Sequence, residues 1–452
     1  MNSGNSFATF GASETPAEAG LPRQGISRRE PLAGAYALLL LFMVVYCARP
    51  GDWIPGLAAV PLAKITAILA LLALAFSLLH GGRRLPREVS YLAVLVGQMF
   101  LAAAFSPVWR GGATQASLDF SKVLIVVVIM AVVVTTGTRL RRLIFVQAGS
   151  VALIALVTVW KGKLELGRLE GSLSGNYADP NDLALAIIIS LPLCLALLFM
   201  SRSFVRKALW AIAMLVMLYA VFLTGSRGGF VALVAAAAAL LWEFAVRGRR
   251  RYLVVVAAIV ACLLWQFSGQ VLRGRLKGTF NPNEDTAASY GSAEARQQLF
   301  WRSIEVTMKH PLFGVGPGNF AEISGSWHVT HNAFTEMSAE AGLPALMLYG
   351  LILWSGFKNV GLVKRWAKRQ KDSNVLAKGL MASLVGYVVG SCFLSVGYNF
   401  LPYFLVAYTT ALFLIIKKSS GRNNVSTLEG QEKAGQEALG VAEEGRTAAF
   451  AS

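Results

Sequence analysis

The stretch Leu183-Ala-Leu-Ala-Ile-Ile-Ile-Ser-Leu-Pro-Leu-Cys-Leu-Ala-Leu-Leu-Phe-Met200 carries no charged side chain. A helix needs about 20 such residues to cross roughly 30 Å of hydrocarbon, and this apolar run at 182–200 is long enough. Comparable runs lie at about 33–48, 57–79, 89–105, 119–136, 143–160, 207–223, 228–246, 252–268, 342–360, 379–397 and 399–416. Lipid-embedded backbone must satisfy its own hydrogen bonds, and runs this continuous exclude a barrel. The sequence therefore predicts an all-α, polytopic membrane helix bundle of about 12 transmembrane helices.

Composition agrees with a membrane protein. Only 15% of the 452 residues are charged and 55% are hydrophobic, whereas soluble domains carry about 25% charged residues. The net charge of +18 does not indicate a nucleic-acid partner, because every second connection between the apolar runs is rich in Arg and Lys. This is the positive-inside pattern. It predicts that both termini are cytoplasmic and that the long loop at 269–341 is extracytoplasmic.

The same pattern divides the chain into five parts. We expect a disordered cytoplasmic N-terminus at 1–30 and transmembrane helices one to nine at 31–268. A large helical loop outside the membrane follows at 269–341, and helices ten to twelve occupy 342–418. Residues 419–452 are rich in Gly, Glu, Ala and Asn, which is typical of a disordered cytoplasmic tail.

Two polar segments interrupt the apolar runs on the outer side. Leu223-Thr-Gly-Ser-Arg-Gly-Gly-Phe230 places Arg227 at the start of a helix, where glycines and the helix dipole suit an anion such as phosphate. A tight interfacial turn with a snorkelling Arg explains the residues equally well. In the second segment, 167–182, the side chains of Asp179, Asn181 and Asp182 suit either sugar hydroxyls or helix capping.

The outer loop holds most of the remaining polar chemistry. Apolar side chains at Leu299, Phe300, Ile304 and Met308 predict an amphipathic interfacial helix at 293–309. Gly314-Val-Gly-Pro-Gly-Asn-Phe320 reads as a flexible turn and lacks the spacing of a dinucleotide fingerprint or a P-loop. His328 and His331 have HxxH spacing, but zinc needs further ligands. An exposed His is usually inert, yet His331 begins a helical stretch and suits proton removal from a hydroxyl.

Taken together, four motifs of this chain resemble the O-antigen ligase/polymerase superfamily, the lipid-linked oligosaccharide ligase-like membrane glycosyltransferases. They are Thr224-Gly-Ser-Arg-Gly-Gly229, Arg296 four residues before Phe300-Trp301, His310-Pro-Leu-Phe-Gly-Val-Gly-Pro-Gly-Asn-Phe320, and His331-Asn332 with Glu340-Ala-Gly-Leu-Pro344. The motifs cover about 165–350, and the helix count and single large loop extend the resemblance over the membrane region. Pro317 within the glycine cluster and the N-terminal Arg49-Pro-Gly-Asp-Trp-Ile-Pro55 segment depart from the common pattern and leave the acceptor open.

The resemblance implies an enzyme that moves a glycan from a polyprenyl diphosphate carrier to an acceptor hydroxyl. The acceptor would be a lipid A core, another glycan or a protein, at the outer face of the bacterial cytoplasmic (inner) membrane. Neither a metal nor another cofactor is implied. His331, Arg227 and Arg296 match the family's catalytic positions. The expected substrate-binding residues are Arg168, Arg302, Asn181, Asn332 and Glu336.

The expected chemistry is simple. Arg227 and Arg296 would hold the departing diphosphate through bidentate hydrogen bonds, while His331 accepts the proton of the attacking hydroxyl. Trp301 and Trp327 would stack on sugars or lie at the membrane interface. A polysaccharide polymerase of the same superfamily shares these motifs and stays an alternative.

A transporter of lipid-linked solutes is a further alternative from a different class. It requires charged residues in mid-span and an internal repeat, whereas this chain shows only Lys64 and Lys122, near helix ends.

Overall fold

The computed structural model describes residues 32–54, 56–57, 60–78, 85–162, 164–165, 168–169, 177, 179–267, 287–326, 328–367 and 370–420. The predicted disordered N-terminus and the predicted tail, except for residues 419 and 420, therefore lie outside the described residues, as does Trp327. The described chain is helical apart from loops and one antiparallel pair of two-residue strands.

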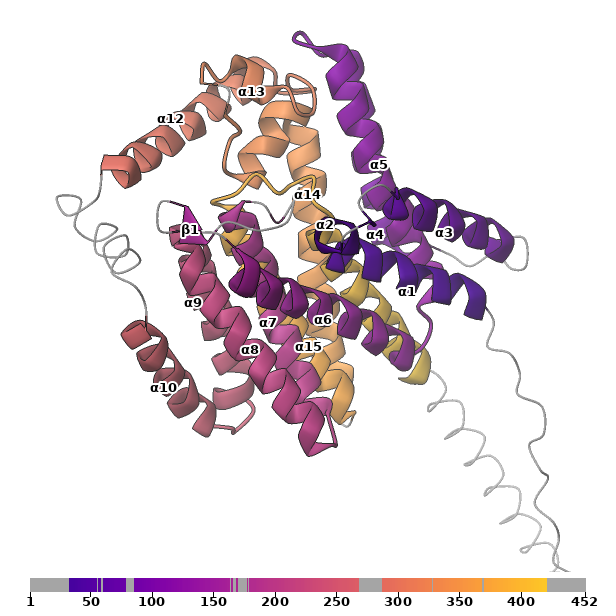
Figure 1. Cartoon of the computed structure of the whole chain (residues 1–452). Helices are drawn as coiled ribbons and strands as arrows, with labels where there is room; N and C mark the ends of the chain where they lie inside the picture. Colours follow the sequence, from indigo (N-terminus) through magenta and orange to yellow (C-terminus); the bar gives the residue numbers. More distant parts are fainter. Residues whose placement is uncertain are drawn as a thin grey trace, which may run out of the picture.

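The elements follow one another in a single bundle (Figure 1). They are α1 (Ala33–Ala48), α2 (Pro50–Trp53), α3 (Leu62–Leu78), α4 (Arg87–Ala104), α5 (Arg110–Val133), α6 (Gly137–Lys161), β1 (Leu164–Glu165), β2 (Arg168–Leu169), α7 (Pro180–Met200), α8 (Phe204–Thr224), α9 (Arg227–Leu241), the π-helical turn η2 (Trp242–Val246), α10 (Tyr252–Phe267), α12 (Ala287–Lys309), α13 (Phe320–Ile323), α14 (Ala333–Trp366), α15 (Lys371–Ser391) and a last helix, Phe400–Ser420.

The prediction of an all-α membrane bundle is confirmed, but the count of 12 spans is not. Within the described residues, nine helices are long and apolar enough to cross a membrane. Helices α1, α3 and α10, which correspond to three of the predicted spans, have 16, 17 and 16 residues. They are shorter than the roughly 20 residues that a perpendicular span needs.

Helix α7 is the centre of the bundle, because 83% of its most apolar window is buried inside the protein. It packs closely on α15 and α9 through small residues. A Cβ at Gly379 would lie 2.9 Å from the Pro192 carbonyl oxygen, and one at Gly390 would lie 2.4 Å from Leu185. Close approach of this kind stabilises helix pairs in lipid, where no hydrophobic force drives association. It also brings the first turns of α7 and α9 together.

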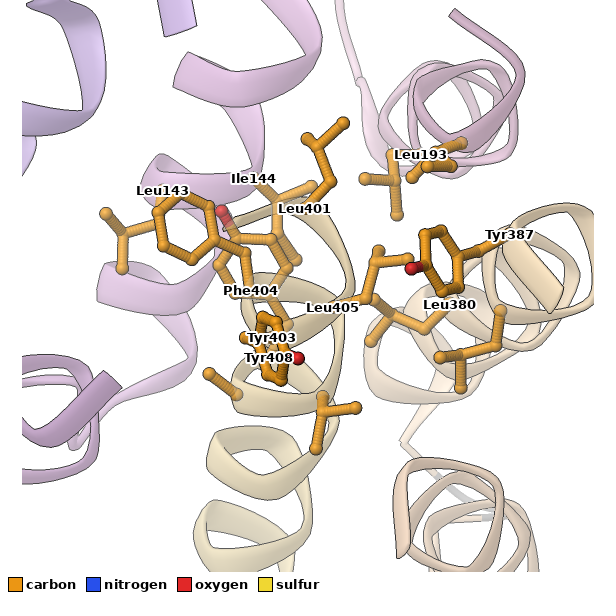
Figure 2. Close-up of a cluster of buried hydrophobic side chains, with 14 of the residues drawn as sticks. Leu143, Ile144, Leu193, Leu380, Tyr387, Leu401, Tyr403, Phe404, Leu405 and Tyr408 are labelled. Carbon is orange, nitrogen blue, oxygen red and sulfur yellow. The ribbon is translucent and has the colours of Figure 1, made fainter. Parts of the chain in front are cut away.

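The last helix runs through the core rather than along the edge. Its side chains Leu401, Tyr403, Phe404, Leu405 and Tyr408 are buried and meet residues of α6, α7 and α15 (Figure 2). The buried tyrosines find polar partners: the Tyr408 hydroxyl donates to Gln147 Oε1 at 2.8 Å, and the Tyr403 hydroxyl donates to the Gly397 carbonyl at 2.8 Å. Satisfied hydroxyls of this sort are required in a dry interior.

Two predicted boundaries differ from the structure. Helix α14 begins at Ala333, nine residues before the predicted span at 342–360, and is broken at Gly342, whose φ is +85°. Helix α15 ends at Ser391, so the predicted span at 379–397 was wrong for its last residues. Residues 392–399 instead form a loop before the last helix. Hydropathy alone does not reveal this loop, because Cys392-Phe-Leu-Ser-Val396 is nearly as apolar as the helices on either side.

The described part of the 269–341 loop packs on the first turns of α14 (Figure 1). The predicted helix at 293–309 lies within α12. Only part of the predicted apolar face is docked: Leu299 and Val306 are buried against Val315, Phe320 and Ala339, whereas Met308 is 73% exposed. The hydroxyls of Thr307 and Ser338 share a hydrogen bond of 2.9 Å across the interface of α12 and α14.

Candidate active site

Arg227 is the first residue of α9 and is fixed by the turn before it. Gly225 has a φ of +57°, a conformation that glycine adopts without strain, and the Ser226 hydroxyl accepts from Gly229 N at 3.1 Å as the N-cap. A Cβ on Gly228 would lie 2.6 Å from Phe393 Cβ. Glycine at this position therefore allows α9 to pack against the 392–399 loop.

Arg168 connects the end of α8 to the first turn of α7. Its Nε donates to the Thr224 carbonyl at 2.9 Å, where α8 ends, and its Nη2 donates to Asn181 Oδ1 at 3.1 Å, in the first turn of α7. Asp179 caps α7, with Oδ1 accepting from Asn181 N at 2.6 Å. Arg168 and Asn181, both expected to bind substrate, thus contact each other and support the turn that carries Arg227.

His331 is held in an unusual backbone conformation. Its φ of +53° lies in the left-handed region, which non-glycine residues rarely adopt. The amide N–H of His331 donates to the Ser395 hydroxyl at 2.8 Å, and that hydroxyl also contacts the Thr330 hydroxyl at 3.0 Å. Such conformations persist where the surroundings enforce them, and they cluster at functional sites.

The next residue begins α14. Asn332 is its N-cap, with Oδ1 accepting from Phe334 N at 2.9 Å and from Thr335 N at 3.2 Å. Asn332, another expected substrate-binding residue, is therefore engaged in capping. The cap fixes the helix directly after His331 and so limits the directions that the imidazole can take.

Glu336 lies one turn further along α14 and is buried. Its Oε2 accepts from Gly397 N at 2.9 Å, and the Gly397 carbonyl accepts from Tyr403. The Val396 carbonyl accepts from the Tyr387 hydroxyl at 3.3 Å. Glu336, expected to bind substrate, thus fixes the same loop that carries Ser395.

The glycine segment at 314–320 is tightly packed rather than a flexible turn. Gly314, Gly316 and Gly318 all have positive φ, and a Cβ at Gly314 would lie 2.4 Å from the Glu340 backbone carbon. The buried Glu340 carboxylate accepts from Gly318 N at 2.7 Å and from Phe320 N at 3.2 Å. The segment therefore fastens α12 and α13 to α14.

Electrostatic interactions connect Arg227, Arg296 and His331. Partial burial, and next the positive charge of Arg227, lower the pKa of Arg296, while Asp179 opposes the shift. Burial, and next the charge of Arg296, lower the pKa of His331 from 6.5 to about 4, again against Asp179. Charges affect one another in this way only over short distances. The charges of Arg227 and His331 are therefore each coupled to Arg296, and Asp179, the N-cap of α7, acts on both Arg296 and His331.

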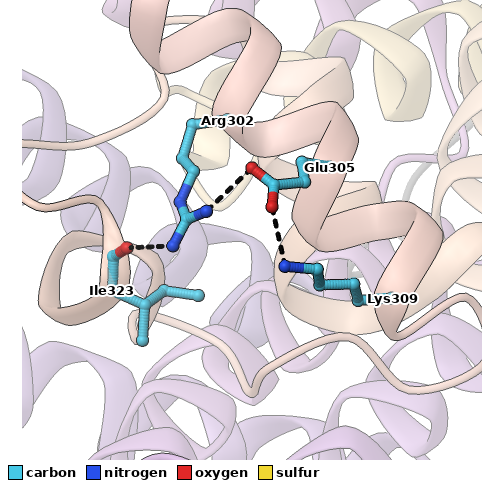
Figure 3. A network of polar contacts seen from close by, with 4 residues as sticks. All are labelled: Arg302, Glu305, Lys309 and Ile323. Carbon is cyan, nitrogen blue, oxygen red and sulfur yellow. Dashed lines mark hydrogen bonds and ion pairs between the residues drawn. The ribbon is translucent and has the colours of Figure 1, made fainter.

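Arg302 lies elsewhere on α12 (Figure 3). Its Nη1 donates to Glu305 Oε2 at 2.7 Å and its Nη2 donates to the Ile323 carbonyl at 3.4 Å, while Lys309 contacts the other oxygen of Glu305. Six residues along a helix turn a side chain by about 240°, so Arg302 lies on a different face from Arg296. The structure does not bring Arg302 to the other expected site residues.

No group of three or more His, Cys, Asp or Glu residues that is suited to a metal ion occurs in the part of the chain described above. Of the HxxH pair, His328 is exposed, and its Nδ1 lies 2.5 Å from the Ser326 carbonyl oxygen. Its charge contributes a small lowering of the pKa of His331.

Comparison with known families gives one match. Residues 212–350 match the family described as O-antigen ligase, which confirms the resemblance inferred from the motifs. The match includes Arg227, Arg296 and His331, and it leaves out Arg168, Asn181 and the 392–399 loop. No curated protein matches the chain.

Sequence reasoning missed Ser395 and Gly397, which hold the site together without carrying charge. The one signal in the sequence was Gly397-Tyr-Asn399, three residues that disfavour an uninterrupted membrane helix.

Proposed function

On the premise that residues 212–350 form an O-antigen ligase domain in a multi-pass membrane protein, we propose that the chain is a metal-independent glycosyltransferase. It transfers a glycan from a polyprenyl diphosphate carrier to an acceptor hydroxyl at the outer face of the cytoplasmic membrane. The single observation that carries this proposal is the electrostatic grouping of Arg227, Arg296 and His331 from three distant segments.

The two arginines suit a diphosphate. Arg227 and Arg296 carry like charges that depress the pKa of Arg296, so a bound dianion would relieve their repulsion. Guanidinium groups make paired, charge-assisted hydrogen bonds to phosphate oxygens. As the bond from the sugar C1 to the diphosphate oxygen breaks, negative charge grows on that oxygen, and the arginines stabilise it.

His331 suits the role of general base. Its lowered pKa keeps the imidazole neutral at pH 7 in the free protein, so a nitrogen lone pair is present to take a proton. The acceptor oxygen forms its bond to the sugar C1 and loses its proton to the imidazole. Binding of the anionic donor next to Arg296 would raise the pKa of His331 and make it a stronger base when it is needed.

The charge pattern supports an orientation for this site. The Arg- and Lys-rich connections alternate with the segments that carry the site, and basic connections stay in the cytoplasm. In our proposal both termini are cytoplasmic, and the site faces the periplasm together with α12 and α13. Membrane lipid surrounds the helices and the polyprenyl tail.

The decisive experiment is transfer by the purified full chain in lipid nanodiscs, with a polyprenyl diphosphate glycan as donor and candidate acceptors. Arg227→Ala, Arg296→Ala and His331→Ala should each abolish transfer at normal protein levels. Arg227→Lys should also lose most activity, because an ammonium cannot make the paired contacts. Arg110→Ala is the matched control, since Arg110 is exposed at the start of α5. Full activity in any two of the three alanine variants would remove the assignment.

A polymerase role is the second candidate, because the matched family domain is compatible with either reaction. Glycan length in a deletion strain separates the two. Loss of a ligase leaves long chains on the carrier, whereas loss of a polymerase leaves single repeat units.

A further inference from the structure

A cavity of about 610 Å³ lies where α1, α2 and the start of α3 meet the last helix. This volume falls within the usual range of small-molecule sites, about 300–1,000 Å³. Aliphatic side chains form much of its wall, and polar side chains of several kinds are set among them. The polar ones are Tyr46, Arg49, Asp52, Lys64, Tyr177 and Asn399.

The cavity shares chain segments with the candidate active site. Tyr177 is two residues before Asp179, whose charge acts on Arg296 and His331. Asn399 is four residues after Ser395, which accepts the His331 amide. The 392–399 loop therefore contacts the backbone of His331 through Ser395 and lines the cavity through Asn399. A molecule in this cavity would lie next to the segment that positions His331.

Arg49 is a half-buried cation in the wall of the cavity. Arg49 ends α1 with a φ of +45°, a left-handed conformation that non-glycine residues rarely adopt. Its Nε pairs with Asp52 Oδ2 at 2.5 Å. Burial raises the pKa of Tyr177 and the charge of Arg49 opposes that shift; both side chains line the cavity.

Lys64 adds a second cation from the first turn of α3 and is exposed to solvent. The lining side chains therefore include two cations and one carboxylate. An anion is favoured in such a cavity, while the carboxylate of Asp52 and the tyrosine hydroxyls suit neutral hydroxyl groups.

We propose that this cavity binds the acceptor, and that the acceptor sugar carries an anionic group, either a phosphate or a carboxylate. Arg49 and Lys64 contact the charge, and the tyrosines, Asp52 and Asn399 contact sugar hydroxyls. The donor diphosphate lies apart, with Arg227 and Arg296. This assignment rests on the glycosyl transfer proposed above and names the chemical class of its second substrate.

Binding of simple sugars by the purified full chain tests the proposal without any transfer reaction. Saturation-transfer NMR would compare glucose, glucuronic acid and glucose 1-phosphate on the protein in nanodiscs of uncharged lipid. We expect the charged sugars to bind about tenfold more tightly than glucose, the usual effect of one charged hydrogen bond. The stronger of the two charged probes identifies phosphate or carboxylate as the natural group.

Variants locate the binding. Lys64→Ala should remove most of the preference for charged sugars, and Arg49→Ala should do the same. Lys64 is the safer test, because Arg49 also pairs with Asp52. Arg110→Ala removes an equal charge outside the cavity and should change nothing, and Arg227→Ala should keep the preference. Equal binding of glucose and the charged sugars would overturn the proposal.

A charge preference that survives Lys64→Ala and Arg49→Ala but disappears in Arg227→Ala would also overturn it, because the anion would then lie in the donor site. Failure of the transfer assay with intact charged-sugar binding would count against the proposed activity alone.

Discussion

The amide N–H of His331 donates to the hydroxyl of Ser395 at 2.8 Å, across 64 residues of sequence. The bond joins the outer loop to the connection between the last two helices. It holds His331 at a φ of +53°, and the direction of the imidazole depends on that conformation. Ser395 is thus a positioning residue for the proposed base rather than a catalytic one.

Removal of this hydroxyl should impair the reaction more than the binding of donor. Ser395→Ala leaves the His331 amide without its partner, which costs about 1–3 kcal/mol. We expect kcat to fall roughly ten- to hundredfold, with little change in the KM for donor. Ser395→Thr retains a hydroxyl and should restore part of kcat. Steady-state kinetics measure both constants.

The control for that variant is Ser391→Ala. Ser391 is also buried near the end of α15, but its hydroxyl donates to the Val388 carbonyl of the same helix. It should leave kcat unchanged. An equal loss in both variants would mean that Ser395 affects general stability and not His331.

The left-handed backbone at His331 predicts an unusual order of stability. Asn and Gly adopt this conformation easily, whereas β-branched residues do not. His331→Gly and His331→Asn should therefore be inactive but unfold at or above the wild-type temperature. His331→Val should lose roughly 1–2 kcal/mol of stability. Thermal unfolding in detergent measures the three, and a His331→Val variant as stable as His331→Gly would contradict the conformation.

The lowered pKa of His331 predicts a specific titration. In the free protein the imidazole should stay neutral as the pH falls, and take up its proton only near pH 4 rather than near 6.5. Arg296→Gln removes the second cause of the shift, so the pKa should rise toward 6.5 while burial keeps it below that value. Histidine-selective NMR is practical because the chain has only 4 His residues. An unchanged titration in Arg296→Gln would place Arg296 away from His331.

Arg168 and Asn181 should act as one unit. Because each is a partner of the other, at 3.1 Å, Arg168→Ala and Asn181→Ala should each destabilise the fold by about 1–3 kcal/mol. The double variant should cost much less than their sum. The KM for donor separates this role from direct binding. A large rise in KM with unchanged stability would show that Arg168 contacts substrate.

Two glycines of α14 should respond in opposite ways to alanine. A Cβ at Gly342 would lie 2.3 Å from the Leu312 carbonyl oxygen, and the φ there is +85°. Gly342→Ala should therefore lose several kcal/mol or fail to accumulate. Gly350 has no neighbour within 4 Å, and Gly350→Ala should be neutral or gain up to about 1 kcal/mol. Comparable losses in the two variants would contradict the described break at Gly342.

The sequence predicted the helical bundle because long apolar runs have few other solutions in lipid. The residues alone left Arg227 and His331 open, and the resemblance of the motifs implied Arg227, Arg296 and His331 as catalytic positions. The roles of Arg168, Asn181, Asn332 and Glu336 were harder to foresee. Each has a side chain that suits a ligand, yet each forms hydrogen bonds within the protein.

The boundaries of α14 and α15 could not be predicted from hydropathy. The break at Gly342 depends on a tertiary contact, in which Gln98 Nε2 donates to the carbonyls of Leu312 at 2.7 Å and Ala341 at 2.9 Å. Gln98 of α4 thus satisfies two backbone carbonyls at the break. The sequence around Gly342 does not indicate that Gln98 is the partner of these carbonyls.

The 392–399 loop has a practical consequence for engineering. It lies outside the segment that matches the ligase family, yet Phe393 packs on Gly228, Ser395 holds His331, and Gly397 binds Glu336. A chimaera that exchanges residues 212–350 between two such proteins would combine His331, the proposed base, from one protein with the 392–399 loop of the other. Chimaeras that exchange the 392–399 loop together with residues 212–350 should be the ones that retain activity.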